Sequence, residues 1–201
     1  MIFVQNITTK QAPLLLPTMV LNRSTRVEVR QLEGRDHYVV PVVMLTTGVH
    51  AGDNGPLLYQ NEALTDSVPL WNGKPVVVYH PLMGRAGSPE VFSKQRVGLV
   101  FNTIVRNEQL AAEAWLDVER LTSVAPKLAE AVIAGNKVEV STGLYTLKNS
   151  MVGVHNGKQY GGIATTIQPD HLALLPGKVG ACSIADGCGM GTTMTKQRAL
   201  V

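Results

Sequence analysis

The stretch KPVVVYHP (Lys74–Pro81) decides the expected fold, together with KVEVSTGL (Lys137–Leu144). The first stretch has valines on consecutive positions, which predicts a strand buried on both faces. The second alternates valines with polar residues, which predicts a strand with a single buried face. His80 therefore stands where a strand leaves a sheet, and Ser141 shares a strand face with Glu139.

A third apolar segment, PDHLALLP (Pro169–Pro176), opens with an acid next to a histidine. A serine nucleophile, a histidine base and a group that orients the base are what covalent hydrolysis of an amide requires. Adjacent residues of a regular strand point to opposite faces, so we expect only one of Asp170 and His171 to reach a given site. Each residue also has an ordinary alternative. Ser141 would be an exposed strand serine, His80 a histidine bonded to a carbonyl, Asp170 a turn cap and His171 a structural residue.

Composition limits the classes of function. The chain has 201 residues, of which 45% are hydrophobic and 5% aromatic, so Val, Leu, Ile and Ala must fill the core of what we expect to be one domain. Its formal charge is +3 and it has no Lys/Arg block, which disfavours sequence-directed binding of nucleic acid. The apolar patch APLLLPTMVL (Ala12–Leu21) is too short to span a membrane and contains two prolines, so we expect a soluble protein.

The two cysteines and the histidines do not form a metal-binding pattern. Cys182 and Cys188 have a single C-x5-C spacing without a second pair, so we expect reduced thiols in a cytosolic protein rather than a local disulfide. His80, Asp170 and His171 lack the spacing of a known metal motif. We therefore expect no metal and no cofactor.

The remaining segments predict a mainly β protein with a closed or barrel-like sheet flanked by a few helices. Two strands are expected at residues 96–107 and 108–119, and a hairpin is expected to turn at Asn156–Gly157. The segments YGGIATTIQ and DHLALLP are expected to form two separate strands.

Helices and loops complete this prediction. One helix should run from Thr122 to Gly135, and a shorter one from Tyr59 to Asp66 after a loop at HAGDNG. The Gly- and Ser-rich residues 82–95 predict a flexible flap. The predicted domains are an N-terminal arm or edge strand over residues 1–40, a main domain over residues 41–189 and a flexible tail over residues 190–201.

In combination, the blocks VVVYHP, RVGLV, AEAWLDVERL, VEVSTGL and DHLALLPGKVGACSIADGCG resemble the prohead maturation proteases of tailed phages, distant relatives of the herpesvirus assemblins. The resemblance extends from about Pro41 to Gly189 and implies a β-barrel flanked by helices. By position, it implies that His80 and Ser141 form the catalytic pair. For the third member it offers Asp170 or His171, and we favour Asp170 because the phage enzymes commonly have an acid there.

The resemblance also implies a function. A serine endopeptidase of capsid maturation would cut scaffold protein, the leader of the major capsid protein and possibly itself, inside the procapsid in the host cytoplasm. It would need no cofactor, nucleic acid or membrane, and could form a homo-oligomer. Backbone amides near Thr142 and Gly143, or from the strand of Gly98, would stabilise the oxyanion. The competing interpretation is a non-enzymatic assembly or scaffold-associated protein, or a degenerate protease-like binding domain.

Overall fold

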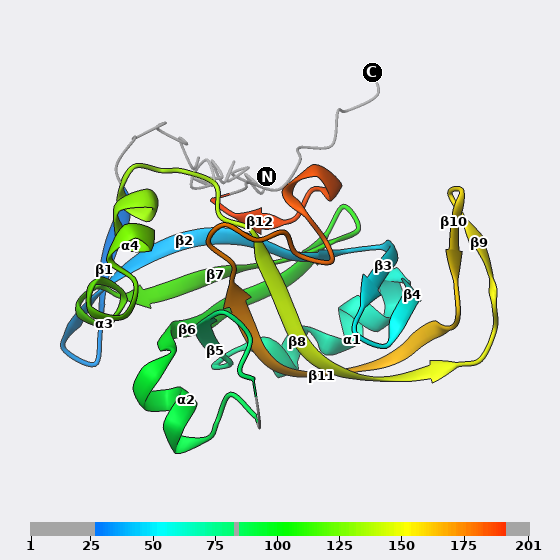
Figure 1. The fold of residues 1–201 in the computed structure, drawn as a ribbon, viewed down its shortest axis with the longest axis horizontal. Coiled ribbons are helices and arrows are strands. Elements are labelled where there is room, and N and C mark those ends of the chain that lie inside the picture. The colour runs from blue at the N-terminus through cyan, green and yellow to red at the C-terminus, as the bar shows by residue number, and fades with distance from the viewer. Residues whose placement is uncertain (1–26, 83–84, 192–201) are drawn as a thin grey trace, which may run out of the picture.

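The computed structural model describes residues 27–82 and 85–191, which form a mainly β protein with a few helices (Figure 1). The strands are β1 (Glu28–Leu32), β2 (Arg35–Thr46), β3 (Gly48–Gly52), β4 (Gly55–Tyr59), β5 (Pro75–Val78), β6 (Arg96–Arg106), β7 (Gln109–Asp117), β8 (Val140–Asn149), β9 (Gly153–His155), β10 (Lys158–Tyr160), β11 (Ile163–Leu174) and β12 (Gly189–Met190). The helices are α1 (Asn61–Trp71), α2 (Pro89–Lys94), α3 (Val118–Val124), α4 (Pro126–Ile133) and the 3-10 helix η1 (Ile184–Asp186).

A large mixed sheet organises the molecule. Its hydrogen-bonded path is β1-β2-β7-β6-β5-β11-β4-β3, with β8 paired to β11 and β12 paired to β2. β5 and β4 run parallel to β11, whereas the other neighbours are antiparallel. Regular strand pairing within the described residues does not close this sheet into the predicted barrel. A single bridge between Val138 and Met190 links the start of β8 to β12 and so to β2.

The central strands are buried on both faces because helices and loops cover them. On β5, Val76 and Val78 belong to the main core, while Val77 packs in a second apolar cluster with Ala86, Val91, Ala173 and Leu175. This confirms the prediction made from the consecutive valines. Burying each such side chain contributes roughly 1.5–3 kcal/mol, which stabilises the pairing of β5 with β11 at the centre of the sheet.

Several predicted elements need correction. The predicted loop HAGDNG is mostly part of the β3–β4 hairpin, in which Asp53 and Asn54 form the turn. Helix α1 begins two residues later than the expected Tyr59 and extends beyond Asp66 to Trp71. The predicted flap contains α2, whose first turn is capped by Ser88 and begins at Pro89. The helix expected from Thr122 to Gly135 is two helices, because the chain breaks at Ala125 before a proline and Asp117 caps the earlier one.

The predicted boundaries also fall inside strands. β2 runs through residue 40, and Met190 is buried in β12 where it pairs with Val42, so neither position separates an arm or a tail from the sheet. Residues 1–26 and 192–201 of the predicted arm and tail lie outside the described residues. β11 is one strand where two were expected, and it has a register shift on either side of its middle.

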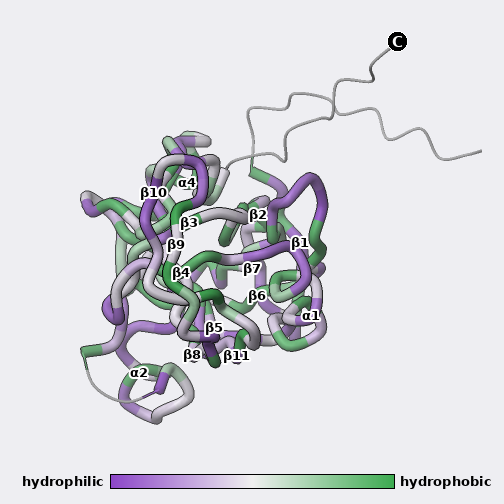
Figure 2. The backbone as a smooth tube through the Cα atoms, turned by 90° about the vertical axis from the view of Figure 1, so that its right-hand side faces the viewer, coloured by the Kyte–Doolittle hydropathy of each residue, from purple (hydrophilic) through white to green (hydrophobic). Residues whose placement is uncertain are grey.

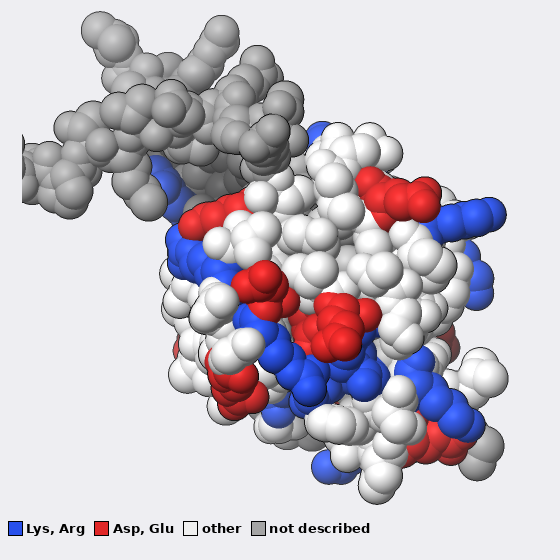
Figure 3. All heavy atoms as spheres, turned by 90° about the vertical axis from the view of Figure 1, so that its left-hand side faces the viewer, with Lys and Arg blue, Asp and Glu red and all other residues white. Residues whose placement is uncertain are grey.

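The hairpins at residues 96–117 and 153–160 are confirmed, and the second projects from the body of the molecule (Figure 1). Figure 2 shows β1 at the rim with mostly hydrophilic colouring, as expected of an edge strand with exposed side chains. Acidic and basic residues interleave on the face shown in Figure 3. None of the helices in the described residues is long and apolar enough to span a membrane.

Candidate active site

His80 leaves the sheet at the end of β5 and lies in the wall of a cavity of about 1010 Å³. The preceding residue, Tyr79, has a left-handed backbone with φ of 60°. Tyr79 continues the pairing of β5 with β11, since its N–H donates to the carbonyl of Leu174 at 3.0 Å. His80 is therefore the first residue beyond a buried, hydrogen-bonded strand, which holds its backbone in place.

Asp170 and His171 both face this cavity, which corrects the expectation that only one of them could. The reason is an irregularity in β11: the register with β8 shifts between Pro169 and His171, so Asp170 has no partner there. A bulge inserts an extra residue and breaks the alternation of side chains. Two neighbouring residues thus reach one site.

A chain of hydrogen bonds joins the three residues. His80 Nδ1 lies 2.8 Å from His171 Nε2, and His171 Nδ1 lies 2.8 Å from Asp170 Oδ2. The same carboxylate oxygen accepts the backbone N–H of Ala86 at 2.9 Å. The residue in contact with His80 is therefore His171, which corrects our preference for Asp170. Asp170 contacts the other ring nitrogen of His171 and so orients that ring.

For a neutral His171, these contacts fix the tautomers. The Asp170 carboxylate can only accept, so His171 Nδ1 carries the proton, and the Nε2 of neutral His171 is an acceptor. His80 Nδ1 must then donate to it. This leaves His80 Nε2 with a free lone pair, which is the state that a general base needs.

The pKa values of His80 and Asp170 are both lowered, for different reasons. Partial burial lowers the pKa of His80 below the ordinary histidine value, and the facing His171 lowers it further, while Asp53 opposes this shift. Burial alone would raise the pKa of Asp170, but the Ala86 amide and the His171 ring more than offset this and lower it. His80 is therefore neutral, and Asp170 ionised, at neutral pH.

Ser141 lines the same cavity from β8, where it pairs with Ala173 on β11. Its side chain is partly exposed, and no hydrogen bond joins it to His80 in the described part of the chain. Thr142 and Gly143 follow it along the cavity wall. The cavity thus brings together the predicted nucleophile, the predicted base and two of the three predicted oxyanion positions.

Besides offering a candidate oxyanion amide, Gly143 leaves room for the His171 ring because it has no side chain. It pairs directly with His171 across the two strands, and a Cβ at this position would overlap the His171 imidazole ring. The His171 ring occupies the space that a side chain at position 143 would fill. Gly98, the third oxyanion candidate, does not line the cavity. It lies between β5 and β7, where a Cβ would overlap the carbonyl oxygen of Trp115, so it is a packing residue.

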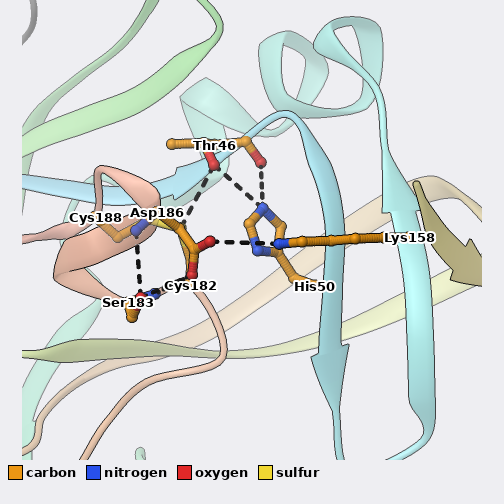
Figure 4. Close-up of polar contacts among 7 residues, drawn as sticks. All are labelled: Thr46, His50, Lys158, Cys182, Ser183, Asp186 and Cys188. Carbon is orange, nitrogen blue, oxygen red and sulfur yellow. Dashed lines mark hydrogen bonds and ion pairs between the residues drawn. A yellow bond between two sulfur atoms is a disulfide. The ribbon is translucent and has the colours of Figure 1, made fainter. Parts of the chain in front are cut away.

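Residues 178–182 form another part of the cavity wall, and they lead into a loop that a disulfide closes. Figure 4 shows the polar contacts of this loop. Cys182 and Cys188 are bonded to each other, which corrects the expectation of reduced thiols. Sequence spacing could not predict this, because the bond depends on a turn that places the two Cα atoms 5.6 Å apart. Ser183 and Asp186 form a capping box inside the loop, and the carboxylate of Asp186 lies 3.4 Å from Lys158 Nζ.

Two further contacts attach this loop to the sheet. The carboxylate of Glu139 accepts the backbone N–H groups of Gly180 and Ile184 at 3.3 and 3.1 Å. On the other side, the Thr46 hydroxyl lies 3.5 Å from Cys182 Sγ and 3.2 Å from His50 Nε2 (Figure 4). The buried His50 also lines the cavity. Burial lowers the pKa of this histidine.

No protein-family model matches this chain, and no curated protein matches its sequence. One solved structure is similar. It is the bacteriophage T4 capsid assembly protease, gp21, with a TM-score of 0.45 and 13% sequence identity, covering 75% of this chain and 88% of that chain.

The cavity contains the groups that acid–base chemistry at a serine would use. A free imidazole nitrogen, oriented by a second histidine and an aspartate, shares a cavity with a serine hydroxyl. Among the described residues, no three histidine, cysteine or carboxylate side chains gather as a metal-binding group. Sequence reasoning missed Tyr79 and the Ala86 amide, since a left-handed backbone and a backbone donor leave no signal in residue type.

Proposed function

We propose that this protein is a serine endopeptidase of phage capsid maturation. The observation that carries the proposal is the relay from His80 through His171 to Asp170, which ends in a cavity also lined by Ser141. The relay leaves His80 Nε2 free to accept a proton, and a histidine with a perturbed pKa in a cavity is typical of functional sites. The resemblance of the sequence blocks that contain these residues supports the biological role.

The reaction would be acyl transfer through Ser141. As Ser141 Oγ attacks the carbonyl carbon of the scissile peptide bond, His80 Nε2 takes its proton, and the new imidazolium is stabilised through His171 by the Asp170 charge. Backbone N–H groups near Thr142 and Gly143 would bind the oxyanion. The imidazolium then gives its proton to the leaving amine, and water hydrolyses the acyl-enzyme by the same steps.

The contact between Ser141 and His80 would form when substrate binds. Catalytic hydrogen bonds are often long in free enzymes and shorten in the substrate complex. The substrates would be the scaffold protein and the leader of the major capsid protein, with self-cleavage as a further reaction inside the procapsid. A homo-oligomer remains part of the proposal.

A covalent probe tests the chemistry without knowledge of the substrate. Diisopropyl fluorophosphate labels an activated serine when Oγ bonds to phosphorus and fluoride leaves, and intact mass with peptide mapping locates the adduct. We expect one adduct, on Ser141, that is lost in Ser141→Ala and slowed by roughly 10³-fold in His80→Ala. Ser150→Ala, on a serine outside the cavity, is the matched control and should label normally.

Co-expression with the scaffold and major capsid proteins of the same phage tests the role. Defined cuts that vanish in Ser141→Ala and His80→Ala, seen by intact mass, would support capsid maturation. The absence of a Ser141–His80 hydrogen bond favours one alternative, a degenerate protease-like binding domain. That alternative predicts no Ser141 adduct and unchanged partner masses, although the partners would still bind the chain.

A further inference from the structure

Tyr79 has an unusual backbone for its residue type. Tyr79 is one of six described non-glycine residues with a positive φ. The other five are Asn or Glu residues in hairpin turns or at the register shift in β6: Glu33, Asn102, Asn107, Glu108 and Asn156. Tyr79 is the exception, a bulky aromatic residue in the cavity wall with φ of 60°. A left-handed conformation is costly for such a residue and persists only where surrounding contacts impose it.

This conformation decides where His80 points. Along β5, Val76 and Val78 face the main core, and regular alternation would send residue 80 to the same side. The left-handed residue interrupts the alternation. As a result, His80 is exposed to the cavity and reaches His171, whereas a regular strand would bury it against the valines.

Three contacts hold Tyr79 in this conformation, and all three go to one short segment. Its backbone N–H donates to Leu174 at 3.0 Å, and its hydroxyl donates to the carbonyl of Pro176 at 2.9 Å. The ammonium of Lys178 lies 5.0 Å from the centre of its ring. This segment, residues 174–178, begins with the last residue of β11, the strand that carries His171. Tyr79 thus connects the end of β5, which leads to His80, with the end of β11, which contains His171.

We propose that Tyr79 is a positioning residue, which sets the direction of His80 and ties it to the strand of His171. Its ring does not act on the reacting atoms. The kinetic consequence rests on the proposed protease function, but the effect on the two histidines does not depend on it. The proposal therefore has one readout in the rings themselves and a second in the rate of the reaction.

Two variants separate the effect of the left-handed backbone from that of the hydrogen bond to Pro176. Tyr79→Phe keeps the ring and loses the hydrogen bond to Pro176, while Tyr79→Val brings a β-branched residue that does not tolerate a left-handed backbone. Tyr38→Phe removes a tyrosine hydroxyl from β2 outside the cavity and serves as the matched control. Urea unfolding establishes that each variant is folded.

The first readout is NMR of ¹⁵N-labelled histidine rings over a pH titration. In the parent, the shifts should report His80 protonated on Nδ1 and bonded to His171. In Tyr79→Phe, and more strongly in Tyr79→Val, we expect this tautomer preference to weaken and the His80 titration to move toward that of free histidine. If Tyr79→Val does not fold, Tyr79→Phe alone decides the outcome. Parental ring shifts and titration in folded Tyr79→Phe would overturn the proposal.

The second readout is peptide cleavage. Misplacing a catalytic group by about 1 Å can cost roughly 10²-fold in rate, so we expect kcat to fall about tenfold in Tyr79→Phe with KM nearly unchanged. A parent that neither cleaves nor labels, but whose ring shifts respond to Tyr79→Phe, would refute the protease function and leave the positioning role standing. A parent that cleaves, with variants of parental kcat and ring shifts, would refute the positioning role alone.

Discussion

Replacing Gly143 with alanine is the sharpest test of how the site is built. The new Cβ would overlap the His171 ring, so the ring must turn away or the two strands must separate. Overpacking of this kind typically costs about 1–3 kcal/mol of stability. A turned ring cannot keep both of its 2.8 Å hydrogen bonds, to His80 and to Asp170. Loss of the group that orients a catalytic histidine can lower the rate by roughly 10³-fold or more.

The assay measures both quantities on one protein. Urea unfolding gives the change in the free energy of unfolding, and the rate of diisopropyl fluorophosphate labelling, followed by intact mass, gives the reactivity of Ser141. Gly161→Ala is the matched control because its φ is ordinary and the atom nearest to an added Cβ is the Pro56 carbonyl oxygen at 3.8 Å. We expect this control to label at the parental rate and to unfold within about 1 kcal/mol of the parent.

The same variant separates two roles of Gly143. Alanine keeps the backbone N–H, so an oxyanion role of that amide would survive the substitution if the His171 ring were undisturbed. Parental stability and parental labelling in Gly143→Ala would therefore refute the argument that the absent side chain makes room for the ring. A slow but stable variant would indicate that the ring turns without disturbing the strands.

Four further outcomes follow from the site and the residues around it. Labelling should rise with pH through a midpoint below about 6.5, because burial and His171 lower the pKa of His80. The buried His50 has a lowered pKa too, so unfolding takes up protons at acidic pH, and urea titrations should show stability falling as pH drops below about 6.5. Asp170→Asn should label roughly 10²-fold more slowly without losing the fold, as circular dichroism would show. Reducing the Cys182–Cys188 disulfide, which closes a loop of sequence separation 6, should lower the free energy of unfolding by about 2 kcal/mol, measured by urea with and without dithiothreitol.

Regular elements could be predicted from the sequence because their side-chain periods are regular. The consecutive valines of β5 indicated burial on both faces, and the hairpin at residues 96–117 followed from apolar runs on both sides of a tight turn. The hairpin at residues 48–59 was missed because its Gly, Asp and Asn residues are as typical of a loop as of a tight turn. Helix α2 was missed because six residues are too few to show a helical period.

The candidate site could be predicted only in part, because it lies where a strand is irregular. His80 and Ser141 could be proposed from their places on strands, but their partner could not be chosen between Asp170 and His171. The choice depends on a bulge that lets both residues face one cavity, and bulges insert a residue without requiring a particular residue type. The periodicity argument was sound for a regular strand and failed at the point where the strand is irregular.

Two such irregularities meet in this site, and the relay needs both. The bulge at Asp170 turns the acid and His171 toward the same side of β11, and the left-handed Tyr79 turns His80 off the core face of β5 toward them. If either strand were regular, one member of the relay would point into the core or across the sheet. The paired strands hold the backbones of the relay residues in place, and the two irregularities determine which way their side chains point. The geometry of the candidate site therefore depends on Tyr79 and Gly143 as much as on the histidines, since they limit where the histidine rings can lie.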